Sequence, residues 1–293
     1  MSWPGLLSNN EDCVLLALGM RLKTCFVRGT LVLCALVLGA HVGSAVELKR
    51  ETIEAFDRYT AELETHLEPR WHGTHFLWSD DEPGGRDKLA EGSIVVRPAN
   101  GNGVIAVKNG LIQDWIGAVF LPHCTLKTVL GIVQDYDHHK EIYKPQIADS
   151  KMQSHQGDDF QIYLRIVKSK FFLNLVVNSE HKVHFTMLDP QKAYSRSYST
   201  RIAEVSEPGK KGEHELPVGD DRGLLWRLYN YWFFEERDGG VYATCQSVSL
   251  TRDIPFGMGK LLAPIIHDLP GESLELSLEQ LRKASSVIAL RAN

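Results

Sequence analysis

The chain has 293 residues, of which 43% are hydrophobic and 24% are charged, and these are ordinary values for a globular protein. Its formal net charge of −5 provides no basic field for a polyanion, which argues against a nucleic-acid-binding protein. Two short basic runs, Lys168-Ser169-Lys170 and Lys210-Lys211, are typical of solvated turns. The length allows one large domain or two smaller ones.

Residues 1–46 have the pattern of a secretory signal peptide. Basic residues between Arg21 and Arg28 precede an uncharged apolar stretch over 29–40, and small residues follow at 43–45. Met20 would be a natural start, which would make residues 1–19 a mis-assigned extension. We expect an exported protein, periplasmic or extracellular. The alternative is an uncleaved membrane tether, but the apolar stretch is shorter than the ~20 residues a spanning helix needs.

Two cysteines remain after removal of this segment, Cys124 and Cys245. An oxidising compartment would permit a disulfide between them. The alternative is a pair of buried thiols that pack as small apolar groups, and we prefer that alternative.

Residues 47–110 predict a helix followed by a small β region. Apolar residues from Phe56 to Leu67 recur at helical spacing, and Pro69 is expected to end the helix at 47–69. Short segments at 72–78, 93–98 and 104–110 have β-like composition and are separated by turn residues.

Residues 111–293 predict the main domain. Asp114–Leu121 reads as a strand, Thr125–Asp135 as a helix with Thr125 as its N-cap, and His138–Tyr143 as a second short helix. Alternating apolar residues predict strands at 160–166, 171–177, 194–205, 224–234 and 241–251, with a long polar loop at 207–223. Apolar spacing from Leu262 to Ile288 predicts a terminal amphipathic helix, kinked or broken at Pro270-Gly271.

This order indicates an α+β fold in which a curved antiparallel sheet wraps around a long C-terminal helix. The most detailed local pattern lies at 121–152, where a proline, helically spaced valines, an aspartate, an aromatic residue and a second proline occur at Pro122, Val129, Val133, Asp135, Tyr143 and Pro145. It resembles the helix-grip layout of the START-like (SRPBCC) superfamily, in its polyketide cyclase/dehydrase-like or coenzyme-Q-binding-like branch. The resemblance covers about 111–284 and implies a cavity under the sheet; it does not fix a function.

Metal and catalytic signatures are not apparent in the sequence. His138 and His139, with Asp135 and Asp137 nearby, resemble a metal cluster, but adjacent histidines on a helix point about 100° apart. His72 and His75 are likewise weak candidates for metal ligands, since a strand and a turn account for them more simply. No H-E-x-x-H, C-x-x-C or G-x-S-x-G motif occurs. We therefore expect no metal ligand, cofactor or catalytic residue that the sequence can name.

Polar and aromatic residues within the apolar strands are the candidate ligand contacts. They are either partners in an internal network, such as Arg252 with Glu235, or groups that orient a ligand in an apolar pocket. The candidates are Arg165, Tyr198, Trp226, Asn230, Trp232 and Arg252.

The sequence therefore predicts binding or transfer of a hydrophobic or amphipathic small molecule, such as a lipid, quinone or polyketide-like compound, with transient membrane contact as a further expectation. A cyclase, dehydratase or hydrolase using the same cavity is the first alternative, with Tyr163, Tyr198 and Asp253 as acid or base. An interaction module with a filled interior is the second. The sequence does not determine the oligomeric state.

Overall fold

The computed structural model describes residues 46–73, 75–170, 173–254 and 259–292, and residues 45–293 form one compact unit. The predicted signal peptide lies outside the described residues. The helices are α2 (Arg50–His72), α3 (Gly85–Ala90), α4 (Leu126–Val133), α5 (His139–Ile142) and α6 (Gly259–Ala292), with 3₁₀ turns at Trp78–Asp80 and Tyr136–His138. The strands are β1 (Val46–Glu47), β2 (Ile94–Pro98), β3 (Val104–Val107), β4 (Gly110–Pro122), β5 (Ile147–Gln156), β6 (Asp159–Lys170), β7 (Leu173–Asp189), β8 (Lys192–Ser206), β9 (His214–Glu215), β10 (Asp220–Asp221), β11 (Arg227–Arg237) and β12 (Gly240–Arg252).

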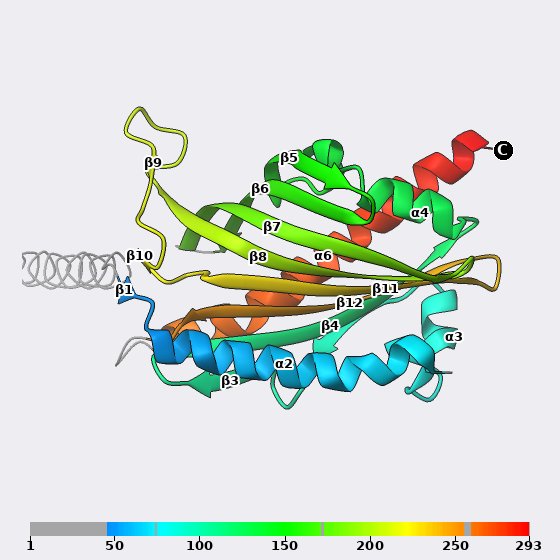
Figure 1. Cartoon of the computed structure of the whole chain (residues 1–293), viewed down its shortest axis with the longest axis horizontal. Helices are drawn as coiled ribbons and strands as arrows, with labels where there is room; N and C mark the ends of the chain where they lie inside the picture. Colours follow the sequence, from blue (N-terminus) through cyan, green and yellow to red (C-terminus); the bar gives the residue numbers. More distant parts are fainter. Residues whose placement is uncertain (1–45, 74, 171–172, 255–258, 293) are drawn as a thin grey trace, which may run out of the picture. The chain divides into compact units, whose positions relative to one another are not determined.

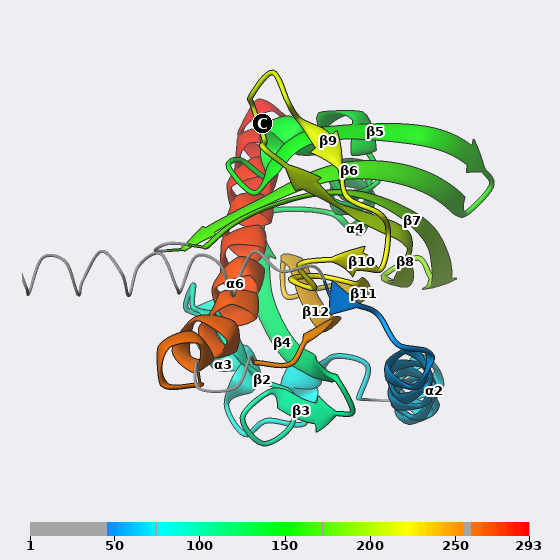
Figure 2. The ribbon, with the colours of Figure 1, turned by 90° about the vertical axis from the view of Figure 1, so that its left-hand side faces the viewer.

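Ten of the strands form one large antiparallel sheet in the order β2-β4-β12-β11-β8-β7-β6-β5, with β3 paired to β4 and β9 to β8, and β1 and β10 form a separate antiparallel pair. The sheet curves around α6, which crosses its inner face (Figures 1 and 2). The two short helical segments follow β4, as predicted, and Thr125 caps α4 by accepting a hydrogen bond from the backbone N–H of Thr128 at 3.2 Å. The predicted α+β helix-grip fold is confirmed.

The outer face of the sheet is covered by α2. Phe56 packs edge-on against Tyr229 at 5.0 Å, and Trp71 stacks on Tyr194 at 4.7 Å between ring centroids. Both β2 and β3 pair with β4. The expected division between residues 110 and 111 therefore does not separate two units, because the N-terminal helix and strands complete the same sheet.

Hydrogen bonds also join α2 to the outer face. The hydroxyls of Tyr198 and Tyr231 both donate to Oε1 of Glu64, at 2.7 and 2.9 Å. Tyr59 donates to the buried carboxylate of Asp114, which also accepts from the amide of Gln246 at 2.8 Å. Burial raises the pKa of Asp114 despite these donors.

The two helices that contain an internal proline both continue through it, contrary to the helix end or break predicted from the sequence. The helix α2 continues through Pro69 to His72, so the end expected at Pro69 and the strand expected at 72–78 are wrong. The helix α6 likewise runs through Pro270 without a break, and it bends in its N-terminal part (Figure 2). In both cases packing against the sheet outweighs the local loss of one backbone hydrogen bond. No helix in the described ranges is long and apolar enough to cross a membrane.

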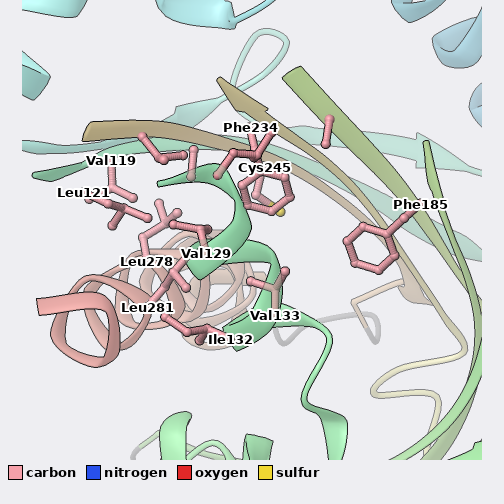
Figure 3. Close-up of a cluster of buried hydrophobic side chains, with 14 of the residues drawn as sticks. Val119, Leu121, Val129, Ile132, Val133, Phe185, Phe234, Cys245, Leu278 and Leu281 are labelled. Atoms are coloured by element: carbon pink, nitrogen blue, oxygen red, sulfur yellow. The ribbon is translucent and has the colours of Figure 1, made fainter. Parts of the chain in front are cut away.

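The C-terminal half of α6 packs closely on β4 and α4. Leu278 and Leu281 are fully buried against a cluster that includes Val119, Leu121 and Val129 (Figure 3). A Cβ atom placed on Gly117 of β4 would lie 2.7 Å from Leu278, so the glycine sets how closely helix and sheet approach. At Gly271 the helix is similarly close to the ring of Trp115.

Candidate functional site

A pocket of about 270 Å³ lies between the sheet and the N-terminal half of α6. Most of its walls are aliphatic and aromatic side chains from β6, β7, β11 and α6, among them Ile162, Leu164, Ile166, Phe185, Trp232 and Leu274. The corresponding residues farther along α6, Leu278 and Leu281, pack tightly and do not line it. An apolar cavity of about 150 Å³ is enough to hold benzene, so this pocket has room for a larger apolar molecule.

A row of polar side chains crosses one wall of the pocket. Asn230 of β11 is paired in register with Ser197 of β8 on one side and Ser247 of β12 on the other, and all three line the pocket. None of these three side chains makes a hydrogen bond within the part of the chain that the structure describes. Polar groups in an apolar wall favour a partner, so this row can donate to and accept from a bound molecule.

One cation, Lys168 near the end of β6, lies among the described lining residues. Its Nζ donates to Oε1 of Gln146 at 2.6 Å, and the amide of Gln146 donates to the backbone oxygen of Ser273 on α6 at 3.1 Å. This chain of contacts joins β6 to α6 at one end of the pocket. The acceptor of the lysine is thus a neutral amide.

The surroundings of Lys168 disfavour its positive charge. Lys168 is half-buried, and loss of water around its amine among apolar side chains lowers its pKa to about 7, well below the usual value for lysine. No carboxylate in the described residues lies within ion-pair distance of its Nζ, and none lines the pocket. The amine is therefore divided between charged and neutral forms near neutral pH.

Neighbouring cations are compensated, in contrast to Lys168. Lys170, two residues along β6, pairs with Glu272 of α6 at 2.6 Å. Arg165 pairs with Glu213 at 3.0 Å, and Arg222 pairs with Glu204 at 2.7 Å. Lys168 therefore differs from these three cations, because no carboxylate of the described residues pairs with it.

His139 of α5 and Tyr143, the residue that follows α5, form another part of the wall. The imidazole of His139 is buried, its Nε2 lies 3.1 Å from the backbone oxygen of Val133, and burial lowers its pKa to about 4. It is neutral at pH 7. His138 points elsewhere and contacts Asp135 at 2.8 Å on the surface, so the two adjacent histidines do not converge. No group of three or more histidine, cysteine or acidic residues that would suit a metal ion occurs in the described segments.

Two of the six residues predicted as ligand contacts line the pocket, Asn230 and Trp232. Tyr198 and Arg165 lie on the opposite face of the sheet, where Tyr198 contacts Glu64 of α2 and Arg165 contacts Glu213. Each strand alternates its side chains between the two faces, and both faces are covered here. The predicted alternation of side chains along the strands is present, but Tyr198 and Arg165 lie on the face that points away from the pocket.

Trp226 and Arg252 also lie outside the pocket lining. The indole of Trp226 is buried and donates to Asp221 at 3.0 Å, just before β11 begins. The backbone N–H of Arg252 donates to the oxygen of Gly223 at 2.7 Å. The suggested pairing of Arg252 with Glu235 does not form, because Glu235 lies opposite Tyr242 at the other end of β12 and pairs with Lys192 and Arg237.

Lys168, Ser197 and His139 line the pocket but were not among the predicted contacts, and the run that contains Lys168 was predicted to be a solvated turn. The signal was present: Phe160, Ile162, Leu164 and Ile166 alternate at a period of two, and Lys168 continues the same face. The structure extends β6 through Lys170, which places the lysine inward.

Cys124 and Cys245 are separate free thiols, both buried. Cys245 lines the pocket opposite Gly117, and burial raises its pKa. Cys124 lies beyond the end of β4, and its thiol points to the backbone oxygen of Ser285 on α6 at 3.7 Å. The alternative of a disulfide is therefore not present.

Comparison with known proteins found no matching family model and no matching curated protein. Solved structures with similar folds include a STAR-related lipid transfer protein fragment from Xanthomonas axonopodis, at 17% identity and a TM-score of 0.38, covering 61% of this chain and 99% of that one. They also include a START superfamily protein from Mycobacterium smegmatis, at 10% identity and a TM-score of 0.40, covering 60% and 98%. The Zhui aromatase/cyclase from Streptomyces sp. R1128 shares 11% identity at a TM-score of 0.39, covering 60% and 94%.

These neighbours are START-like and polyketide-cyclase-like proteins, the groups that the sequence was found to resemble. At such low identities and TM-scores the likeness concerns the fold only. Ligand and reaction have to be argued from the pocket of this chain.

Proposed function

We propose that the protein binds one apolar or amphipathic small molecule in the pocket between the sheet and α6. The observation that carries the proposal is the pocket itself: space of about 270 Å³ with mainly apolar walls and a row of three polar side chains without described partners. Such a combination of apolar walls and a few convergent polar groups is typical of small-molecule sites.

The expected affinity follows from the area that a ligand would bury. An apolar molecule that loses ~400 Å² of surface to water gains roughly 10 kcal/mol before other terms. Lost tumbling and side-chain ordering remove several kcal/mol of that. A dissociation constant on the order of micromolar is the expected result.

A pocket-filling substitution tests this function. Replacing Ser197 by phenylalanine places a ring in the pocket, and we expect the affinity for a neutral naphthylamine fluorophore to fall by roughly tenfold or more, since the ring occupies ligand volume. Thr200→Phe, on the same strand but exposed, is the matched control and should bind the fluorophore normally. Wild-type protein that does not bind the fluorophore, or equal binding by both variants, would reject the function.

A catalytic role of the same pocket is the second candidate, and His139 is the observation that favours it. His139 lines the pocket as a neutral imidazole, and the ring nitrogen that does not contact Val133 can accept a hydrogen bond from a bound molecule, although burial holds its pKa below that of an effective base at pH 7. The test is mass spectrometry of molecules extracted from wild-type and His139→Gln protein purified from the native host. The same molecule in both indicates binding alone, and an unconverted precursor in the variant indicates catalysis.

Export completes the proposal, and its support is the sequence pattern at 1–46. A ligand carrier in an oxidising compartment, with or without transient membrane contact, is the role we infer. Mass measurement of the mature chain checks it: a new N-terminus at or near Val46 is expected, and an intact N-terminal segment would favour the tethered alternative.

A further inference from the structure

The charges along the pocket are distributed unevenly. The row formed by Ser197, Asn230 and Ser247 is uncharged, and His139 is neutral at pH 7. Lys168 is the one cation among the described lining residues, and no described aspartate or glutamate lines the pocket to compensate it. A bound molecule therefore meets a single source of positive charge, at one end.

We propose that the ligand is an amphipathic monoanion, most simply a carboxylic acid with an apolar tail, and that Lys168 binds its acidic group. This inference rests on the proposed function and names the ligand class for the same pocket. The carboxylate would take the place beside Gln146 at the end of β6, where the ammonium has only a neutral acceptor now. A charged hydrogen bond in surroundings of low polarity is stronger than a neutral one.

The shape of the pocket fits a molecule with a head and a tail. Its lining follows β6 from Ile162 to Lys168, a distance of roughly 20 Å along an extended strand. The walls away from Lys168 are apolar, with Phe185 and Trp232 among them. An acidic head at Lys168 would thus direct its tail along the strand and past the row that contains Asn230.

A single negative charge matches this site better than two. Lys168 supplies one positive charge, and the next cation on the strand, Lys170, is held by Glu272 and Asp268 of α6 at 2.6 and 3.8 Å. A doubly charged head group would bury one charge without a partner, which is unfavourable. A cationic head group would be repelled by the positive charge of Lys168.

The experiment compares dodecanoate with dodecanol, which has the same tail length and a neutral head. Binding of each is measured by displacement of the naphthylamine fluorophore from wild-type protein and from Lys168→Met. We expect the substitution to weaken dodecanoate binding roughly tenfold to hundredfold more than dodecanol binding, since it removes one charged hydrogen bond. Lys151→Met, an exposed lysine on β5 without an ion pair in the described residues, is the control and should leave the ratio of the two affinities unchanged.

A pH series adds a second measurement on intact protein. Above about pH 7 the free lysine loses its proton, so wild-type affinity for dodecanoate should fall by up to roughly tenfold per pH unit, while dodecanol affinity stays level. Lys168→Arg keeps its charge and should bind dodecanoate at about pH 9 more tightly than wild type does. The other titratable groups on the elements around this end are His139, Tyr143, Lys170, Asp268, Glu272 and the Glu204–Arg222 pair.

The outcomes separate the two proposals. If wild type binds dodecanol and dodecanoate but Lys168→Met weakens both equally, or if only the alcohol binds, the anionic ligand class is wrong and the pocket function stands. If wild type binds neither compound nor the fluorophore, the function fails and this inference with it. A selective loss for dodecanoate in Lys168→Met, restored by Lys168→Arg, supports the inference.

Discussion

Replacing Leu278 by alanine is expected to lower the free energy of unfolding by roughly 3–5 kcal/mol. Leu278 is fully buried in the tightly packed half of α6 (Figure 3). It lies against Gly117 of β4. Truncation would lose the transfer energy of the side chain and leave a cavity between two rigid elements that cannot close. Chemical denaturation followed by circular dichroism measures the change.

The control for this substitution is Ser277→Ala, at the preceding residue. Ser277 lies on the same helix, but its side chain lines the pocket and, among the described residues, donates only to the backbone oxygen of Ser273, at 2.9 Å. We expect a change within about 1 kcal/mol. A loss below about 1 kcal/mol for Leu278→Ala would mean that the contact between helix and sheet is looser than the structure indicates.

Replacing Lys168 by methionine is expected to stabilise the protein at neutral pH, in the absence of ligand. The pKa of Lys168 is about 7 in the folded protein, whereas an unfolded lysine has a pKa near 10.4. The full difference corresponds to about 5 kcal/mol, and contact of the side chain with water in the open pocket reduces it to roughly 2–4 kcal/mol. Methionine has a similar length and no charge to bury.

The pH dependence of this effect has a defined sign. Between about pH 7 and pH 10 the unfolded lysine holds a proton that the folded lysine has released, so wild-type stability rises with pH through that range on account of this group. Below about pH 7 both states are protonated and the penalty is constant. The advantage of Lys168→Met should therefore be largest at and below about pH 7 and vanish near pH 10.

Chemical denaturation of wild type, Lys168→Met and Lys151→Met at about pH 7 and about pH 10 measures this difference in the free energy of unfolding. The comparison between variants cancels the titration of other groups, and Lys151→Met should behave as wild type because Lys151 is exposed. A Lys168→Met protein no more stable than wild type at pH 7 would show that the ammonium is well solvated. Gained stability together with selective loss of dodecanoate binding would mean that the lysine serves binding at the expense of stability.

The local patterns of the sequence determined most of the secondary structure. Alternation from Phe160 to Ile166 marks β6, Thr125 marks the start of α4, and apolar spacing around Leu274, Leu278 and Leu281 marks α6. These signals depend on neighbours a few residues apart, which is why they are readable without tertiary information. Their order along the chain was also sufficient for the helix-grip fold.

Tertiary structure alone decided which face of each strand meets the ligand pocket. The sheet is covered by α6 on one face and by α2 on the other, so a polar residue on a strand can be buried against either helix. Asn230 faces the pocket and Tyr198 faces Glu64 of α2, although both lie in strands of similar pattern. Lys168 became a pocket residue because β6 extends past the last apolar residue of its run and meets α6 there; the sequence shows the alternation, but the burial and the missing carboxylate follow only from packing between distant segments.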